Sequence, residues 1–398
     1  MKTHFLALLL LIWVSGLAQT HRFKVVSYNS LRYSPNNIDA RHPDLRLIMN
    51  DLQPDLLCLE ELSGLSSAQM YLDSVLNLDS TTYSLATFVD GNDLDIALYY
   101  KTGKFGFIST STYPTALRDI YHFQVVANGI MDTLHIFGVH LKASSGSSNE
   151  QARKAEVDVL RQVTDQFAVG AHFLVCGDFN IYGANEPAYA RLLQNTPNNE
   201  GHFVDQLIMP GTWNNAAYAP YHTQSPRTTQ FNGGVNGGMD DRFDMILMSE
   251  GLNDTVGLHY VTGSMLAYGN DGQHYNNAIN AAPTNTAVGQ VLADALHYAS
   301  DHIPIVAEFE YSISNNTSTI SQPISQVKIF HTSSGILISN PEKIHLNITG
   351  YALDGRKIFK KDIYYTSTLN LSTVKPYILV ISDLQKSILI RKLVLQSE

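Results

Sequence analysis

Short polar side chains stand at the ends of several apolar, strand-like runs of this 398-residue chain. Each is a carboxylate, a carboxamide or a histidine. They are Asn29, Glu61, His140, Asp178, Asn180, Asp244, Asp301 and His302. A single residue of this kind is usually a solvated cap, but six strand ends that carry such groups indicate a site. Carboxylates and carboxamides are ligands that Mg²⁺ accepts, and histidine takes up or releases a proton near neutral pH.

The sequence around two of these positions predicts how the side chains point. Glu60 and Glu61 follow the apolar run 55–59, and strand alternation would direct them to opposite faces of a sheet. Gly177 allows a sharp turn after the strand at 173–176, so that Asp178 and Asn180 project to one side.

The elements that must position these residues are mainly strands. Apolar and β-rich runs predict strands at 23–28, 55–59, 95–100, 121–128, 133–139, 173–176, 243–248 and 303–311. Helical spacing predicts helices at 44–52 and 150–168. The gap between 121–128 and 133–139 leaves room only for a hairpin, so much of the sheet must be antiparallel. This favours a layered β-sandwich with outer helices over a doubly wound parallel sheet.

Six short strings, taken in order, resemble the endonuclease/exonuclease/phosphatase superfamily, which has the deoxyribonuclease-I-like fold. The strings are Ser27–Asn29, Leu57–Glu61, Val139–Lys142, Gly177–Asn180, Phe243–Leu247 and Ser300–Pro304. The resemblance covers about residues 22–311. It implies an α+β fold, a four-layer α/β/β/α sandwich.

The resemblance also implies a role for each residue. Metal binding is implied for Glu61, Asn29 and Asp301. Glu60 stands where the family often has glutamine, and Glu61 is the choice because the family places the acid last. The resemblance implies that His302 is the general base and that Asp244 orients it. Asp178 and Asn180 would position the attacking water and hold a phosphate oxygen. His140 would bind phosphate or act as an acid, and Arg118 would lie near the phosphate.

One part of the family pattern stays open in this sequence. Many relatives have an acid near the third strand that pairs with the first catalytic histidine, here His140. Asp93 and Asp95 both precede the strand at 95–100, and Asp95 is the closer candidate. A turn acid is an equally good interpretation, because Asp often caps turns.

Two long polar loops, 205–240 and 268–285, connect strands that carry site residues and should lie near the catalytic edge. Their aromatic residues, Trp213 among them, either stack on bases or touch lipid, or simply pack within the loops.

Charge is distributed unevenly along the chain. Residues 19–311 hold fifteen Lys and Arg against thirty-one Asp and Glu, and only five of these cations are lysines. A net charge of −16 argues against a broad basic face for nucleic acid, but not against a metal-assisted enzyme, since bound cations invert the local charge. The few lysines argue against a polyphosphorylated inositol substrate.

The two ends of the chain predict export. Residues 1–18 read as a signal peptide, with Lys2 before the apolar run Phe5–Val14, which is too short to span a bilayer. Residues 312–325 read as a neutral linker. Residues 326–398, with a net charge of +5, read as a small all-β domain that resembles the sorting domains of the type IX secretion system. An accessory β-sandwich that binds substrate is the alternative.

The two cysteines, Cys58 and Cys176, lie in apolar runs and read as buried small hydrophobic residues, although a disulfide between them stays open.

We therefore expect a secreted phosphodiesterase that depends on Mg²⁺, with Mn²⁺ or Ca²⁺ as alternatives, and a nuclease before other activities. The alternatives on the same fold are a sphingomyelinase-like phospholipase C and a phosphatase. A non-catalytic binding module would have lost site residues, and none of the expected ones is missing. The expected partners are nucleic acid and the type IX secretion machinery, and the protein is expected to be a monomer without a stable membrane span.

Overall fold

A computed structural model describes most of the chain. The chain divides into two compact units, Ala18–Ile313 and a second unit that contains Ser314–Glu398. In the first unit it describes residues 19–36, 40–79, 81–130, 132–197, 199–230, 233–254 and 257–313. In the second it describes residues 328–332, 335–339, 345–352, 356–363, 366–369, 377–382 and 388–394. The predicted signal peptide and positions 314–325 of the predicted linker lie outside these residues.

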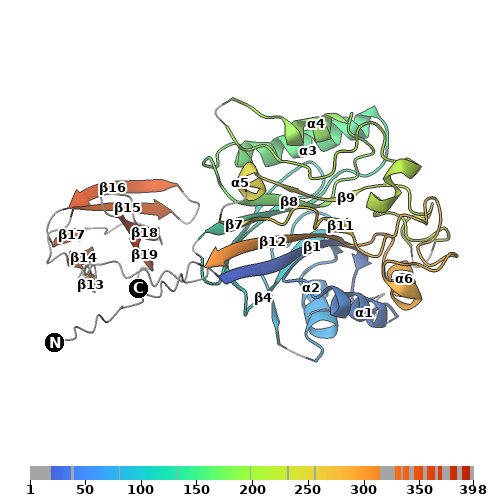
Figure 1. Cartoon of the computed structure of the whole chain (residues 1–398), viewed down its shortest axis with the longest axis horizontal. Coiled ribbons are helices and arrows are strands. Elements are labelled where there is room, and N and C mark those ends of the chain that lie inside the picture. Colours follow the sequence, from blue (N-terminus) through green and yellow to red (C-terminus); the bar gives the residue numbers. More distant parts are fainter. Residues whose placement is uncertain are drawn as a thin grey trace, which may run out of the picture. The chain divides into compact units, whose positions relative to one another are not determined.

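Two mixed sheets form the centre of the larger unit (Figure 1). The first contains β1 (Gln19–Tyr33), β2 (Leu56–Leu62), β3 (Tyr83–Leu85), β4 (Asp95–Lys101), β10 (His259–Tyr260), β11 (Leu266–Ala267) and β12 (Ile305–Ile313). Its order is β10-β12-β1-β2-β4-β3, and β11 also pairs with β12. The second contains β5 (Phe105–Tyr113), β6 (Ile120–Ala127), β7 (Thr133–His140), β8 (Phe173–Asp178) and β9 (Asp244–Met248), in that order. The β1–β2 and β7–β8 pairs are parallel and the other pairs are antiparallel.

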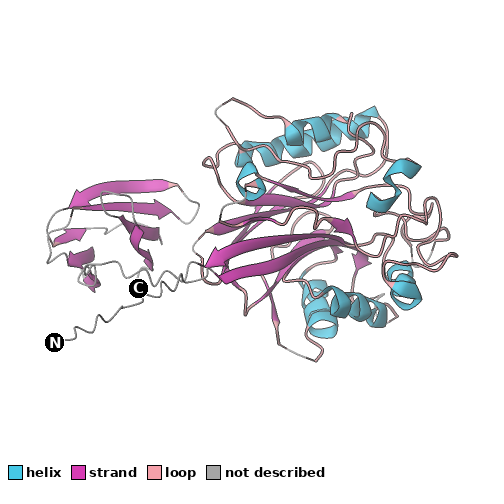
Figure 2. Ribbon diagram, viewed as in Figure 1, coloured by secondary structure: helices cyan, strands magenta, loops and turns pink. Residues whose placement is uncertain are grey.

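Helices cover the outer face of each sheet (Figure 2). α1 (His42–Leu52), α2 (Leu65–Tyr71) and α6 (Gly289–Ala299) lie on the first sheet, and α3 (Ser147–Thr164) and α4 (Pro187–Leu193) lie on the second. A short helix, α5 (Glu250–Asn253), follows β9.

Three apolar layers hold these four layers of structure together. Alternation along β2 illustrates the arrangement: Leu57 and Leu59 pack with α1, whereas Leu56 and Cys58 pack between the sheets. The third layer joins the second sheet to α3 and α4, with Val157 and Leu160 of α3 fully buried there. The unit is thus a four-layer α/β/β/α sandwich, and the fold class predicted from the sequence is confirmed.

One predicted boundary is wrong by two residues. Ser312 and Ile313, assigned to the linker, belong to β12, because they pair in register with Thr20 and Gln19 of β1. The extended pairing comes from the length of β1, which begins well before the predicted strand.

The described part of the second unit is all-β. Its strands are β13 (Lys328–Thr332), β14 (Gly335–Ser339), β15 (Leu346–Ala352), β16 (Lys357–Ile363), β17 (Ser367–Leu369), β18 (Tyr377–Ser382) and β19 (Ile388–Val394). They form two sheets, β13-β14-β17 and β16-β15-β18-β19. Among the described residues, Ile338, Leu346, Ile348, Leu379 and Ile381 are fully buried, so this small unit has an apolar core of its own.

Within the described residues, no helix has the length and apolar character needed to cross a bilayer. Cys58 and Cys176 are buried and free.

Candidate active site

The backbone is irregular where β1 and β2 end. The β1–β2 register shifts after Asn29, and Leu31, Arg32 and Glu61 have φ of 49°, 46° and 62°. These are left-handed conformations that side chains with a Cβ rarely adopt, and such positions concentrate at functional sites. The bulge turns Glu61 out of the alternation of β2, so that its carboxylate accepts from the Arg32 amide at 2.8 Å and faces the edge of the sheet.

Glu60, the neighbour of Glu61, follows the regular alternation and points between the sheets. It is fully buried, and Ser27 donates to its Oε1 at 2.6 Å. Burial, together with the nearby Cys176, raises the pKa of Glu60 well above its ordinary value of 4.5 and so favours the protonated, neutral carboxyl group.

β8 brings Asp178 to the same edge. A Cβ at Gly177 would collide with the carbonyl of Val139 on β7, so only glycine allows the two strands to approach as they do. After the strand, Asn180 adopts a left-handed φ of 51° and its side chain donates to the carbonyl of Leu141 at 3.2 Å.

Glu61, Asp178 and His140 form a cluster that could hold a cation, with one ligand atom from each lying within 4.8 Å of the others. His140 Nε2 lies 3.8 Å from Glu61 Oε1 and 3.6 Å from Asp178 Oδ2. Burial, and then the charge of Arg118, lowers the pKa of His140 well below its ordinary 6.5, so the ring is in the neutral form that binds metals.

Asn29 braces the two carboxylates of this cluster. Its Nδ2 donates to Glu61 Oε1 at 3.0 Å and to Asp178 Oδ2 at 3.2 Å, while its Oδ1 accepts from the amide of Leu31. Burial, with the charges of Asp244 and Glu61, raises the pKa of Asp178 to about 7. Two carboxylates this close repel one another, and a bound divalent cation would relieve that repulsion. The donor set therefore fits a metal.

His302 and Asp244 form a buried pair beside the cluster. His302 Nδ1 lies 2.7 Å from Asp244 Oδ2, and His302 Nε2 lies 3.7 Å from Asp178 Oδ2. Burial alone would lower the pKa of His302, but the carboxylates of Asp244 and Asp178 outweigh it and raise the pKa well above 6.5. A cation held by Glu61 and Asp178 would offset part of that negative charge and favour the neutral imidazole.

All of the predicted site residues except Asn29 and Asp244 line one cavity of about 370 Å³. Arg118 lies in its wall, where its Nε donates to Asp93 at 3.0 Å and its Nη1 to the carbonyl of His140 at 3.2 Å. Asp301 also lines the cavity, but it stands apart from the three-residue cluster, since its Oδ2 accepts from the amide of Val235 at 2.6 Å.

The acid partner of His140 that the sequence left open is not Asp95. The Asp95 carboxylate accepts from Tyr121 Oη at 2.8 Å and from the amides of Gly91 and Gly64. Among the described residues, the buried Nδ1 of His140 has no hydrogen-bond partner.

The first long loop reaches the site, but not through its tryptophan. Trp213 is fully buried and donates to the carbonyl of Met209, so the interpretation of self-packed aromatic residues holds for it. The loop instead places Gln224, Gln230 and Gly233–Val235 in the cavity wall. Gln224, whose side chain lies 2.6 Å from His302 Nε2, was missed in the sequence because it matches none of the strings and ends no predicted strand.

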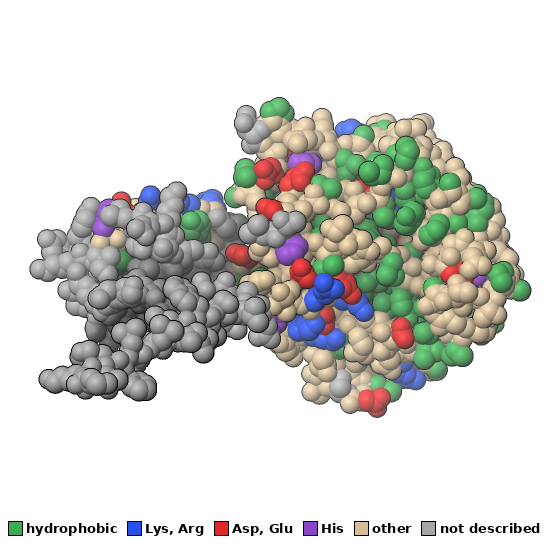
Figure 3. Space-filling view, in the orientation of Figure 1, with side chains coloured by type: hydrophobic (Ala, Val, Ile, Leu, Met, Phe, Trp, Pro, Cys, Tyr) green, Lys and Arg blue, Asp and Glu red, His purple; other side chains and the backbone are tan. Residues whose placement is uncertain are grey.

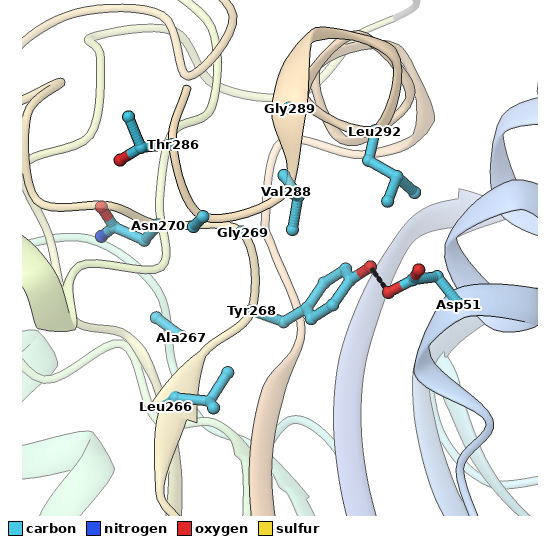
Figure 4. A pocket seen from close by; sticks show the side chains of 11 residues that line it. Asp51, Leu266, Ala267, Tyr268, Gly269, Asn270, Thr286, Val288, Gly289 and Leu292 are labelled. Carbon is cyan, nitrogen blue, oxygen red and sulfur yellow. Dashed lines mark hydrogen bonds between the residues drawn. The ribbon is translucent and has the colours of Figure 1, made fainter. Parts of the chain in front are cut away.

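A second cavity, of about 510 Å³, lies between α1, β11 and the start of α6 (Figure 4). There Tyr268 donates to Asp51 at 2.6 Å. None of the predicted site residues lines this cavity, and its wall carries no cluster of metal-binding groups among the described residues.

No protein-family model and no curated protein matches the chain. Solved structures do. TDP2 from D. rerio, complexed with a single-strand DNA product, matches with a TM-score of 0.50 and 17% identity over 72% of this chain and 98% of that chain. The larger unit has the deoxyribonuclease-I-like fold. The catalytic domain of human Nocturnin with bound sulfate matches with a TM-score of 0.48 and 18% identity over 74% and 97% of the two chains. An endonuclease/exonuclease/phosphatase family protein from Bacteroides thetaiotaomicron matches with 0.44 and 13% over 74% and 97%.

Proposed function

We propose that this protein is a divalent-metal-dependent hydrolase of phosphodiester bonds, and a nuclease in particular. The observation that carries the proposal is the meeting of two groups in one cavity: the Glu61, Asp178 and His140 cluster, and the His302–Asp244 pair. The carboxylate cluster would hold a cation that neutralises charge on the phosphate, and the histidine–carboxylate pair would supply a base for water. Metal-dependent phosphoester hydrolysis uses both.

Glu61, Asp178 and His140 would hold the metal, and Asn29 would keep the two carboxylates in place. Mg²⁺ is the first candidate because two of the three ligands are carboxylates, with Mn²⁺ and Ca²⁺ as alternatives. When bound, the metal neutralises charge on the phosphate oxygens. The involvement of Asp301, predicted from the sequence as a metal ligand, stays a prediction.

The side chains of the chain itself would do the remaining work. His302 would accept a proton from the attacking water at Nε2, while Asp244 holds the proton on Nδ1 and stabilises the imidazolium that forms. Asn180 and Arg118 face the cavity with N–H donors that would bind phosphate oxygens and stabilise the charge of the transition state.

A nucleic acid is the first candidate substrate, because the TDP2 neighbour from D. rerio is complexed with a DNA product. One observation favours the second candidate, a small phosphodiester such as a phospholipid headgroup. Residues 19–311 carry fifteen Lys and Arg against thirty-one Asp and Glu, and Lys and Arg are few on the face of the larger unit in Figure 3. A polyanion gains little from such surroundings.

A substrate panel would decide between these candidates. Plasmid DNA, RNA, sphingomyelin and a phosphomonoester would be incubated with the protein, each with Mg²⁺ and with EDTA. Metal-dependent cleavage of DNA or RNA would support the nuclease, and cleavage of sphingomyelin alone would support the phospholipase C. Cleavage of the monoester alone would identify a phosphatase, and no cleavage of any substrate would refute the proposal.

We also propose that the protein is exported through its signal peptide and that residues 326–398 serve as a type IX sorting domain. The support is the apolar run near the start of the chain, the change of net charge from −16 to +5, and the separate all-β character of the second unit. Deletion of residues 326–398 in the native host should leave the protein short of the cell surface. If the deletion strain still exports it, and the shortened enzyme binds substrate more weakly, the second unit is a binding module.

A further inference from the structure

The backbone of Gln224 is held between the residues that precede β9 and those that precede β12. The amide of Thr223 donates to the carbonyl of Asp241 at 2.8 Å, and the amide of Asp241 donates to the carbonyl of Gln224 at 3.0 Å. On the other side, the amide of Ile303 donates to the carbonyl of Thr223 at 2.9 Å. The segment therefore links the residues before β9 to those before β12, and it holds the Cα of Gln224 in register with His302.

The side chain of Gln224, by contrast, is held at one point. Its Nε2 lies 2.6 Å from His302 Nε2, and this is its one side-chain hydrogen bond to the described residues. The residue is 7% exposed and lines the cavity that contains the Glu61, Asp178 and His140 cluster. A cation at Glu61 and Asp178 favours the neutral ring of His302, and in that form the amide nitrogen of Gln224 donates to Nε2 while the one ring proton lies on Nδ1 toward Asp244.

This contact occupies the atom that the reaction needs. An imidazole nitrogen has one hydrogen-bonding direction, in the plane of the ring, so Nε2 cannot accept from Gln224 and from an attacking water at the same time. The carboxamide must leave Nε2 before His302 can act as a base. A phosphate oxygen that enters the cavity offers the same N–H group a charged acceptor, and hydrogen bonds to charged acceptors are the stronger ones.

We propose that Gln224 is a phosphate-binding residue that caps His302 in the free enzyme and transfers its amide to a phosphoryl oxygen when substrate binds. The inference rests on the proposed function, because the ligand is the phosphate group of the substrate. Only the side chain of Gln224 changes its hydrogen-bond partner, because its backbone stays fixed. Binding of the phosphate and release of His302 Nε2 therefore occur together.

Two substitutions and one control test the proposal. Gln224→Ala removes the donor and leaves His302 held by Asp244. The inhibition constant of inorganic phosphate and KM should then rise about 10-fold to 100-fold, the equivalent of a hydrogen bond to a charged group, while kcat changes less than about 3-fold. Gln224→Glu keeps the length but cannot donate, so it should lose phosphate binding more completely than Gln224→Ala. Gln206→Ala, which removes a glutamine bonded to Asn253 outside the cavity, is the control and should match wild type.

Nitrogen NMR of the side chains gives a readout that does not depend on turnover. When inorganic phosphate is added to wild-type protein with Mg²⁺, the Gln224 amide and His302 Nε2 resonances should shift together with one dissociation constant. His302 resonances in free Gln224→Ala should already lie near their phosphate-bound positions.

The outcomes separate this inference from the proposed function. If wild type hydrolyses phosphodiesters and His302→Ala does not, but both Gln224 variants keep the wild-type phosphate inhibition constant, the cap is refuted and the function stands. A fall in kcat at unchanged phosphate affinity would make Gln224 only a support for the ring, and would also refute it. If phosphate moves both resonances although no phosphoester is hydrolysed, the inference stands and the proposed function fails.

Discussion

Glu60 and Glu61 are adjacent glutamates with opposite environments, and replacing each by glutamine tests the metal site with a matched control. Glu61 contributes a charge to the cluster with Asp178 and His140. Glu60 is fully buried, and burial raises its pKa well above 4.5, which favours the neutral carboxyl group. Glu61→Gln should therefore weaken metal binding, whereas Glu60→Gln changes neither shape nor charge and should not.

The expected size follows from electrostatics. Two unit charges about 4 Å apart in partly buried surroundings interact by about 4 kcal/mol. A loss of about 2.7 kcal/mol, or 100-fold in metal affinity, is therefore a conservative expectation for Glu61→Gln. At a metal concentration 100 times the wild-type dissociation constant, metal binding stabilises wild type by about 2.7 kcal/mol, but stabilises Glu61→Gln by only about 0.4 kcal/mol. For a unit of the size of Ala18–Ile313 the shift in Tm is about 4 °C for wild type and less than about 1 °C for the variant.

The assay is thermal unfolding of wild type and both variants, in EDTA and in MgCl₂ or MnCl₂. Glu60→Gln should unfold within about 1 °C of wild type in both conditions and keep its turnover, since Ser27 still has an oxygen acceptor at 2.6 Å. The reasoning is refuted if Glu61→Gln keeps the full metal-induced shift, or if Glu60→Gln loses it as well.

Three further predictions concern the His302–Asp244 pair, Asp301, and two buried histidines of the second sheet. His302→Ala and Asp244→Asn should each lower kcat at least about 100-fold, and the double variant should lose less than the product of the two; multiplicative losses would separate Asp244 from His302. Asp301→Asn should loosen the Gly233–Val235 loop and raise KM while keeping the metal-induced rise in Tm, because the Asp301 carboxylate holds the Val235 amide; loss of the metal shift would instead make Asp301 a ligand. Burial lowers the pKa of His122 to about 3 and of His135 to about 4, so the stability that they contribute is present above pH 6.5 and lost as the pH falls toward 4. His122→Phe should thus gain on wild type in unfolding free energy by at most about 1.4 kcal/mol per pH unit below 6.5, and a pH-independent difference in urea unfolding would contradict this.

The sequence was sufficient for the layered fold, because the strands that carry it are regular. β2 and β8 are short apolar runs, and α1 shows its buried face at helical spacing, with Leu45, Ile48 and Leu52 fully or almost fully buried. β5 was not predicted, because Ser and Thr fill its second half and all of its side chains except that of Phe105 are only partly buried. α6 follows the second predicted loop and was not predicted, although Ala293, Leu296 and Ala299 share its buried face.

The geometry of the site was less accessible to the sequence. Strand alternation places Glu60 correctly. The bulge that exposes Glu61 depends on three residues with a left-handed backbone conformation, and their residue types do not predict that conformation. His140 lies close to Glu61 because the two sheets that contain β7 and β2 pack face to face, and such packing leaves no local pattern in the sequence. Gln224 and His302 are 78 positions apart, and their contact likewise leaves no local pattern.

Turnover of a simple phosphodiester tests the central claim most directly. Wild-type protein would be assayed with bis(4-nitrophenyl) phosphate after exhaustive treatment with EDTA, and again after Mg²⁺, Mn²⁺ or Ca²⁺ is restored, with His302→Ala as the control for contaminating activity. We predict no turnover in EDTA, recovery with at least one of the three cations, and no recovery in His302→Ala. Full turnover in EDTA, or no hydrolysis with any of these cations, would contradict the assignment of this cavity as a metal-dependent phosphodiesterase site.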